Sequence, residues 1–197
     1  MTLFTPLAGG CRCGQAQFRL EAAPIITHAC HCRFCQQITS APFRAVAMIE
    51  TVHVTLLEGV TRIFEGEGSH RQIRCPDCGC MLWSHRPDLG EAIAFVGLGL
   101  LDEGGRLEPE AHYFIRSKHP WITLPPDVPA FEQLGDPGKA GVRERILAVL
   151  AAAGRVVPVP DWARPPSGAW VVSQFEISDR PIAYEIPYAQ RPGLLYA

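Results

Sequence analysis

Alternation of apolar and polar side chains is the dominant pattern in the first two thirds of the chain. Along residues 15–22, apolar Ala16, Phe18 and Leu20 alternate with polar side chains, which is the period-two pattern of a half-buried strand. Turns that contain Gly or Pro separate this run from similar ones. The pattern predicts an antiparallel, mainly β fold with little helix before residue 135. The other predicted strands are residues 43–49, 52–57, 61–64, 70–74, 92–98 and 111–115.

A helical period replaces this alternation after residue 135. Asp136 followed by Pro137 has the composition of a helix N-cap and first turn, and Gly154 can end the helix. The apolar residues that share one face of this predicted helix are Val142, Ile146, Val149, Leu150 and Ala153.

Residues 135–197 are therefore predicted to form an accessory C-terminal segment after a β-rich domain of residues 1–134. Its helix is followed by a proline-rich arm at 156–168. Two alternating runs, 170–177 and 182–188, could form a hairpin. Composition alone suggests that this segment joins two copies of the chain as a homodimer.

Composition excludes several classes of protein. The chain has 197 residues, of which 47% are hydrophobic, and its net charge is −2. No basic run predicts a nucleic-acid partner. The N-terminal residues lack the pattern of a secretory signal, and the longest apolar run, 92–101, is too short to cross a bilayer. We therefore expect a cytoplasmic protein without a membrane partner, in which clustered cysteines bind metal more often than they form disulfides.

All eight cysteines lie in three short clusters. The sequence Cys75-Pro76-Asp77-Cys78-Gly79 is a short turn that can present two sulfurs to one zinc ion, at Zn–S distances of about 2.3 Å. The glycine lets backbone N–H groups turn toward the sulfurs. The three clusters are Cys11 with Cys13, Cys30 with Cys32 and Cys35, and Cys75 with Cys78 and Cys80.

The most economical division of these cysteines gives two zinc ions per chain. Two separated pairs, Cys11 with Cys13 and Cys75 with Cys78, form a closed structural site of four thiolates. The remaining trio, Cys30, Cys32 and Cys35, provides three ligands and an open position, which is the pattern of a reactive zinc.

Two alternatives remain open for the cysteines. Both sites could be architectural, with Cys80 as the fourth ligand of the second, or the cysteines could form disulfides. Among the neighbouring residues, we expect His31 to face solvent, Phe34 to anchor the core and Trp121 to pack against the β-core. Arg33 could meet an anionic substrate.

The motifs together resemble the glutathione-dependent formaldehyde-activating enzyme family, also called the CENP-V/GFA domain. The resemblance runs from about Leu7 to Gln133, and Cys80 stands where the family usually has Ser or Thr. The motifs that carry it are Cys11-Arg12-Cys13-Gly14, Cys30-His31-Cys32-Arg33-Phe34-Cys35, Cys75-Pro76-Asp77-Cys78-Gly79, Gly97-Leu98-Gly99-Leu100-Leu101-Asp102 and Ser117-Lys118-His119-Pro120-Trp121.

This resemblance implies an Mss4-like, zinc-bound β-fold with two zinc ions divided as above. It also implies a carbon–sulfur lyase activity on small thiol adducts such as S-hydroxymethylglutathione, with glutathione as co-substrate.

The chemistry of the trio agrees with that activity. A zinc held by Cys30, Cys32 and Cys35 is a weak Lewis acid, suited to taking up a substrate thiol as its fourth ligand. The alternative function is a zinc-stabilised binding module without catalysis.

Overall fold

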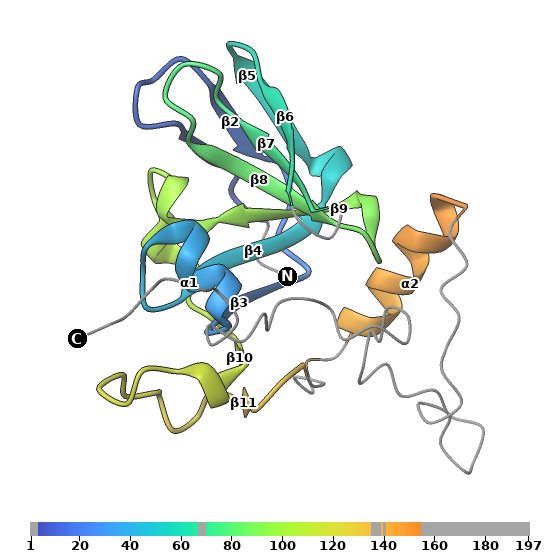
Figure 1. Ribbon diagram of the computed structural model, residues 1–197. Helices are drawn as coiled ribbons and strands as arrows, with labels where there is room; N and C mark the ends of the chain where they lie inside the picture. Colours follow the sequence, from blue (N-terminus) through green and yellow to red (C-terminus); the bar gives the residue numbers. More distant parts are fainter. Residues whose placement is uncertain (1–3, 67–69, 135–138, 140, 155–197) are drawn as a thin grey trace.

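The computed structural model describes residues 4–66, 70–134, 139 and 141–154, which form two β-sheets and two α-helices (Figure 1). The smaller sheet is antiparallel in the order β1-β2-β5, and its strands are β1 (Leu7–Gly10), β2 (Gln17–Leu20) and β5 (Val54–Glu58). The two helices are α1 (Arg33–Thr39) and α2 (Val142–Ala152).

The larger sheet has eight strands in the order β11-β10-β3-β4-β9-β8-β7-β6. All neighbours are antiparallel except that β10 runs parallel to both β3 and β11. The strands are β3 (Ile26–Cys30), β4 (Arg44–Glu50), β6 (Arg62–Glu65), β7 (Arg71–Arg74), β8 (Met81–Arg86), β9 (Gly90–Gly97), β10 (His112–Tyr113) and β11 (Ala130–Phe131).

The central strands of the larger sheet are buried on both faces, and this divides the interior into two cores. On β4, Ala47 and Ile49 belong to the core shared with the smaller sheet, while Val46 and Met48 point to the opposite core, as the alternation of side chains along a strand requires. Strand β9 divides in the same way. The second core on this opposite face includes residues of helix α2.

Helix α2 packs on this opposite face. Its buried residues Val142, Ile146 and Leu150 follow the spacing of an amphipathic helix and join the second core. Arg145 anchors the helix, because it pairs with the buried carboxylate of Glu50 and donates to the backbone carbonyl of Ala23 at 2.7 Å. The predicted helix is thus confirmed, although it begins at Val142, and Asp136 and Pro137 lie outside the described residues.

The mainly β fold with a C-terminal helix is confirmed, with corrections to its details. The two parallel pairings of β10 depart from the expected antiparallel fold. Strands β1, β3, β8 and β11 and the short helix α1 were not predicted. The expected strand at 111–115 is a strand only at His112–Tyr113.

The remaining expectations concern the C-terminal segment. The predicted arm at 156–168 and the hairpin at 170–188 lie outside the described residues, and a domain boundary at 135 stays a prediction. Neither helix in the described part of the chain has the length and apolar character needed to span a bilayer.

Candidate metal centres

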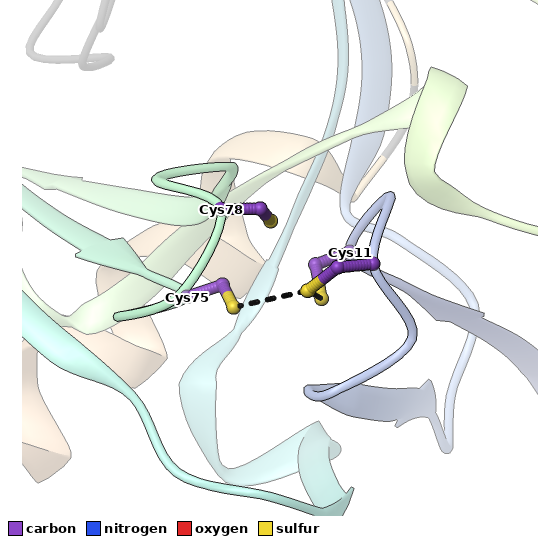
Figure 2. A group of neighbouring side chains, drawn as sticks. Cys11, Cys75 and Cys78 are labelled. Atoms are coloured by element: carbon purple, nitrogen blue, oxygen red, sulfur yellow. Dashed lines mark hydrogen bonds between the residues drawn. The ribbon is translucent and has the colours of Figure 1, made fainter.

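The first cysteine cluster lies where the two sheets meet. Cys11 and Cys13 follow strand β1 of the smaller sheet, and Cys75 and Cys78 follow strand β7 of the larger one. The Sγ atoms of Cys11 and Cys13 are 3.4 Å apart, and those of Cys13 and Cys75 are 3.7 Å apart. All four sulfurs lie within 4.8 Å of one another. Figure 2 shows Cys75 and Cys78 pointing from one loop toward Cys11 on the other.

Both loops use a glycine to turn the chain around the sulfurs. Gly14 and Gly79 have φ angles of +80° and +69°, in the left-handed region that glycine enters without strain. Their N–H groups donate to the carbonyls of Cys11 and Cys75, each at 3.0 Å. The N–H of Ala16 donates to Cys11 Sγ at 3.2 Å. The two loops therefore present their sulfurs on similar, fixed turns.

The pKa values of Cys11 and Cys13 indicate that the cluster suits a bound cation. Burial raises the pKa of Cys11, but the N–H of Ala16 and the neighbouring sulfurs lower it to about 6. The N–H of Gln15 lowers the pKa of Cys13, yet the adjacent Cys11 raises it to about 12. Four thiolates this close repel one another unless a cation neutralises them. A tetrahedron around zinc with bonds of about 2.3 Å has sulfur–sulfur edges near 3.8 Å, close to the distances observed.

Cys80 lies beside this first cluster without being part of it. Its carbonyl accepts from the N–H of Cys75 at 2.9 Å, and its side chain is half-buried against the first core. Burial raises the pKa of Cys80, and the charges of Cys78 and Cys11 add to this. Among the described residues, its sulfur is in neither group of potential ligands. The geometry therefore gives no support to Cys80 as a fourth ligand of the second cluster.

The second cysteine cluster is formed by the end of β3 and the start of α1. Cys30 is the last residue of β3, Cys32 is the N-cap of α1, and Cys35 is in its first turn. Cys32 Sγ accepts from the N–H of Cys35 at 3.4 Å and lies 3.4 Å from Cys30 Sγ. The three sulfurs lie within 4.8 Å of one another.

A buried glutamine fixes the loop that carries this second cluster. Gln36 Nε2 donates to the carbonyl of His31 at 2.7 Å and to that of Ser117 at 2.9 Å. Buried carbonyls need such partners, and here a side chain of α1 provides them. The positions of Cys30, Cys32 and Cys35 are thus held by a strand, a helix cap and a buried hydrogen-bonded side chain.

The thiols of the second cluster also shift one another's pKa. The adjacent Cys30 and Cys35 lower the pKa of Cys32 to about 3, and the same contact with Cys32 raises the pKa of Cys30 well above its ordinary value. One thiolate therefore forms readily and suppresses ionisation of the others. All three thiols can be ionised together only around a cation. Three thiolates are a donor set that zinc prefers.

A cavity of about 80 Å³ opens beside the second cluster, on the face of the larger sheet that also carries α2. The residues of the first cluster are not among those that line it. The group of three sulfurs therefore faces a cavity, whereas the group of four lies at the junction of the two sheets, with Cys13 exposed. The side chains lining the cavity are His28, Cys30, Cys32, Phe34, Cys35, Arg44, Val46, His70, Ser84, Arg86, Phe95, Phe114 and Leu134.

Two arginines bring positive charge to the cavity. Arg86 pairs with the buried carboxylate of Asp88 at 2.7 Å. Arg44 is 7% exposed and lies directly opposite Cys30 in the β3–β4 register. In the described part of the chain, no carboxylate is within ion-pair distance of Arg44. Burial lowers the pKa of Arg44, and the nearby thiolates of the second cluster oppose this shift.

Two neutral histidines complete the cavity wall. Burial lowers the pKa of His28 to about 3 and that of His70 to about 4, and the charge of Arg44 adds to both shifts. Both imidazoles are therefore uncharged at neutral pH. Nδ1 of His28 is buried and has no hydrogen-bond partner among the described residues.

The structure corrects three of the expected residue positions, those of His31, Trp121 and Phe34, and Phe34 belongs to neither core. His31 is fully buried rather than exposed to solvent, and its Nε2 lies 3.0 Å from Nδ1 of His112. Trp121 is 66% exposed and stacks on His119 instead of packing in the core. Phe34 lines the cavity, with its ring 5.3 Å from that of His70.

Arg44, His28 and His70 belong to the site although the sequence analysis did not place them there. Arg44 carries a detectable signal, since it is a charged residue directly before five apolar strand residues, 45–49, and soon after the second cluster. The two histidines carry no comparable signal, because their position depends on the pairing of distant strands.

The chain is similar to one known structure and to one protein family. A crystal structure of a Rhodobacter sphaeroides protein, a structural genomics target, matches with a TM-score of 0.40 and 17% sequence identity, over 48% of this chain and 87% of that one. The sequence profile of the glutathione-dependent formaldehyde-activating enzyme family matches residues 6–117, which is more than half of the chain and includes both cysteine clusters. The chain therefore belongs to the glutathione-dependent formaldehyde-activating enzyme family.

Proposed function

We propose that the protein is a zinc-dependent carbon–sulfur lyase that makes or breaks small thiol adducts such as S-hydroxymethylglutathione. In this proposal each chain holds two zinc ions. Cys11, Cys13, Cys75 and Cys78 hold a structural ion, and the second cluster holds the ion at which the substrate thiol binds.

The observation that carries the proposal is the cavity at the second cluster. Three thiols with a cavity beside them offer a metal three ligands and leave room for a fourth from outside, as in catalytic zinc sites. A structural site has no need of such a cavity. Membership of the family adds a thiol adduct of formaldehyde as the expected substrate class.

The residues around the cavity suit the chemistry of a hemithioacetal. Zinc bound by the three thiolates would favour the ionised form of a substrate sulfur. Phe34, Phe95 and Phe114 line the space and keep it largely apolar, which strengthens electrostatic interactions inside it. The neutral imidazole of His28 offers a hydrogen-bonding group to the reacting end of the substrate.

Exchange between free formaldehyde and its glutathione adduct tests this function. The adduct forms spontaneously, so the measured quantity is the interconversion rate at equilibrium, followed by NMR exchange spectroscopy. We expect the rate to rise in proportion to the concentration of zinc-loaded protein. The control is buffer with the same concentration of zinc. A rate that does not depend on the protein would refute the proposed activity.

A further inference from the structure

Arg44 is a buried cation whose hydrogen-bonding capacity is only partly used. Nη1 donates to Ser84 Oγ at 3.2 Å, and Nη2 donates to the carbonyl of Phe95 at 3.0 Å. A guanidinium has five N–H donors. In the described part of the chain, the remaining donors of Arg44 have no acceptor, although the side chain is only 7% exposed. These donors can bind an acceptor that enters the cavity, because Arg44 lines it.

The position of Arg44 in the sheet explains why its side chain lies at the cavity. Side chains on one face of a sheet are neighbours across paired strands, and Arg44 shares its face with Cys30 and Val46. Its two acceptors, Ser84 and Phe95, are themselves directly paired across β8 and β9. The guanidinium is therefore held on the side of β8 and β9, and Arg44 lines the same cavity as the cysteines of the second cluster.

Electrostatics connects Arg44 with the sulfurs. Burial lowers the pKa of Arg44, and the negative charges of Cys35, Cys30 and Cys32 counteract this. The guanidinium and the thiolates are thus close enough to interact electrostatically. A ligand that places its sulfur at the second cluster would hold the next atoms of its chain near the guanidinium.

We propose that Arg44 binds the oxygen on the sulfur-bearing carbon of the substrate and is selective for an anionic oxygen. This inference rests on the proposed function and names the group that recognises the aldehyde-derived part of the adduct. It predicts a substrate class, namely thiols or thiol adducts that carry a negatively charged or ionisable oxygen one or two carbons from sulfur.

The proposed role of Arg44 is to stabilise the negative charge that develops on the substrate oxygen during the reaction. In the breaking direction, the hydroxyl proton of the hemithioacetal leaves to water, the oxygen lone pair forms the carbonyl bond, and the carbon–sulfur bond electrons go to sulfur. The negative charge on oxygen is greatest between the first and second of these events. A fixed guanidinium next to that oxygen stabilises it, as preorganised donors do in other acyl and carbonyl reactions.

Comparing the binding of two small thiols distinguishes this role of Arg44 from a purely structural one. Thioglycolate and 1-propanethiol each have a thiol on a short carbon chain, but only thioglycolate carries a carboxylate. We expect the zinc-loaded protein to bind thioglycolate roughly 10- to 100-fold more tightly in anaerobic calorimetry, the range given by one charged hydrogen-bonded contact. In Arg44→Met the ratio of the two affinities should fall to about one, whatever the change in thiol binding itself. Arg44→Lys should keep part of the preference.

The control variant is Arg62→Met, which removes an exposed arginine from edge strand β6. It should bind both thiols as the unmodified protein does. Zinc content and circular dichroism verify that each variant is folded, and the comparison of two thiols on the unmodified protein needs no variant at all.

The outcomes distinguish this inference from the proposed function. Equal affinity for the two thiols, or a preference that survives in Arg44→Met, would overturn the role of Arg44 and leave the thiol-binding site intact. Failure of the unmodified protein to bind either thiol would overturn both.

Discussion

Replacing Cys75 with serine is expected to remove one zinc ion and leave the protein unfolded at 37 °C. Cys75 is 1% exposed and its sulfur is 3.7 Å from that of Cys13, across the junction of the two sheets. Structural zinc sites contribute on the order of 10 kcal/mol in small zinc domains, whereas whole domains are stable by only about 5–15 kcal/mol. Loss of this site should therefore cost most of the free energy of unfolding. Thermal unfolding with zinc analysis measures both effects.

Cys80→Ser is the matched control for this prediction. Cys80 is five residues further along the same loop, and its sulfur lies outside the group of four. Its replacement should keep both zinc ions and change the free energy of unfolding by about 1 kcal/mol or less, because its side chain is only partly buried against the first core. A Cys75→Ser variant that keeps two zinc ions and its unfolding temperature would contradict the assignment of a structural site.

Replacing Cys32 with serine is expected to remove the other zinc ion while the protein stays folded. Cys32 is the N-cap of α1, and serine is one of the best N-cap residues, so the helix should persist. Adduct exchange should fall by about 10³-fold or more, because the loss of a catalytic metal costs several kcal/mol of barrier lowering. The measurements are zinc content, unfolding temperature and the exchange rate.

Two results would contradict this second prediction. The first is a Cys32→Ser protein that exchanges formaldehyde as fast as the unmodified one, which would separate the activity from the second cluster. The second is a protein that unfolds as Cys75→Ser does, which would make both clusters structural. The contrast between the two serine variants thus tests the division of the cysteines into two kinds of site.

The grouping of the cysteines could be predicted from the sequence because it depends on local geometry. A short turn with a following glycine can present two sulfurs in only a few ways, and the loop at Cys75 adopts such a turn, with Gly79 at positive φ. Strand alternation is local as well, so the strand around Phe18 was predicted from it. Strand β3, Ile26–Cys30, is buried on both faces and contains Thr27 and His28, so it shows neither alternation nor a continuous apolar run.

The cavity could not be predicted, because it depends on which strands become neighbours. Arg44 meets Ser84 and Phe95 only because β4, β9 and β8 are adjacent in the sheet, and these residues are 40 and 51 positions away in sequence. The burial of His31 has the same origin, since its partner His112 comes from β10. Tertiary pairing of this kind leaves no periodic signal in the sequence.

Zinc X-ray absorption with and without glutathione tests the central claim, that one site is closed and the other open. With four cysteine ligands on one ion and three on the other, the average should be about 3.5 sulfurs per zinc in the protein alone. Saturating glutathione should raise this average to about 4, with two zinc ions still bound per chain. An average of 4 before glutathione is added, unchanged afterwards, would show that both sites are closed and would contradict the account.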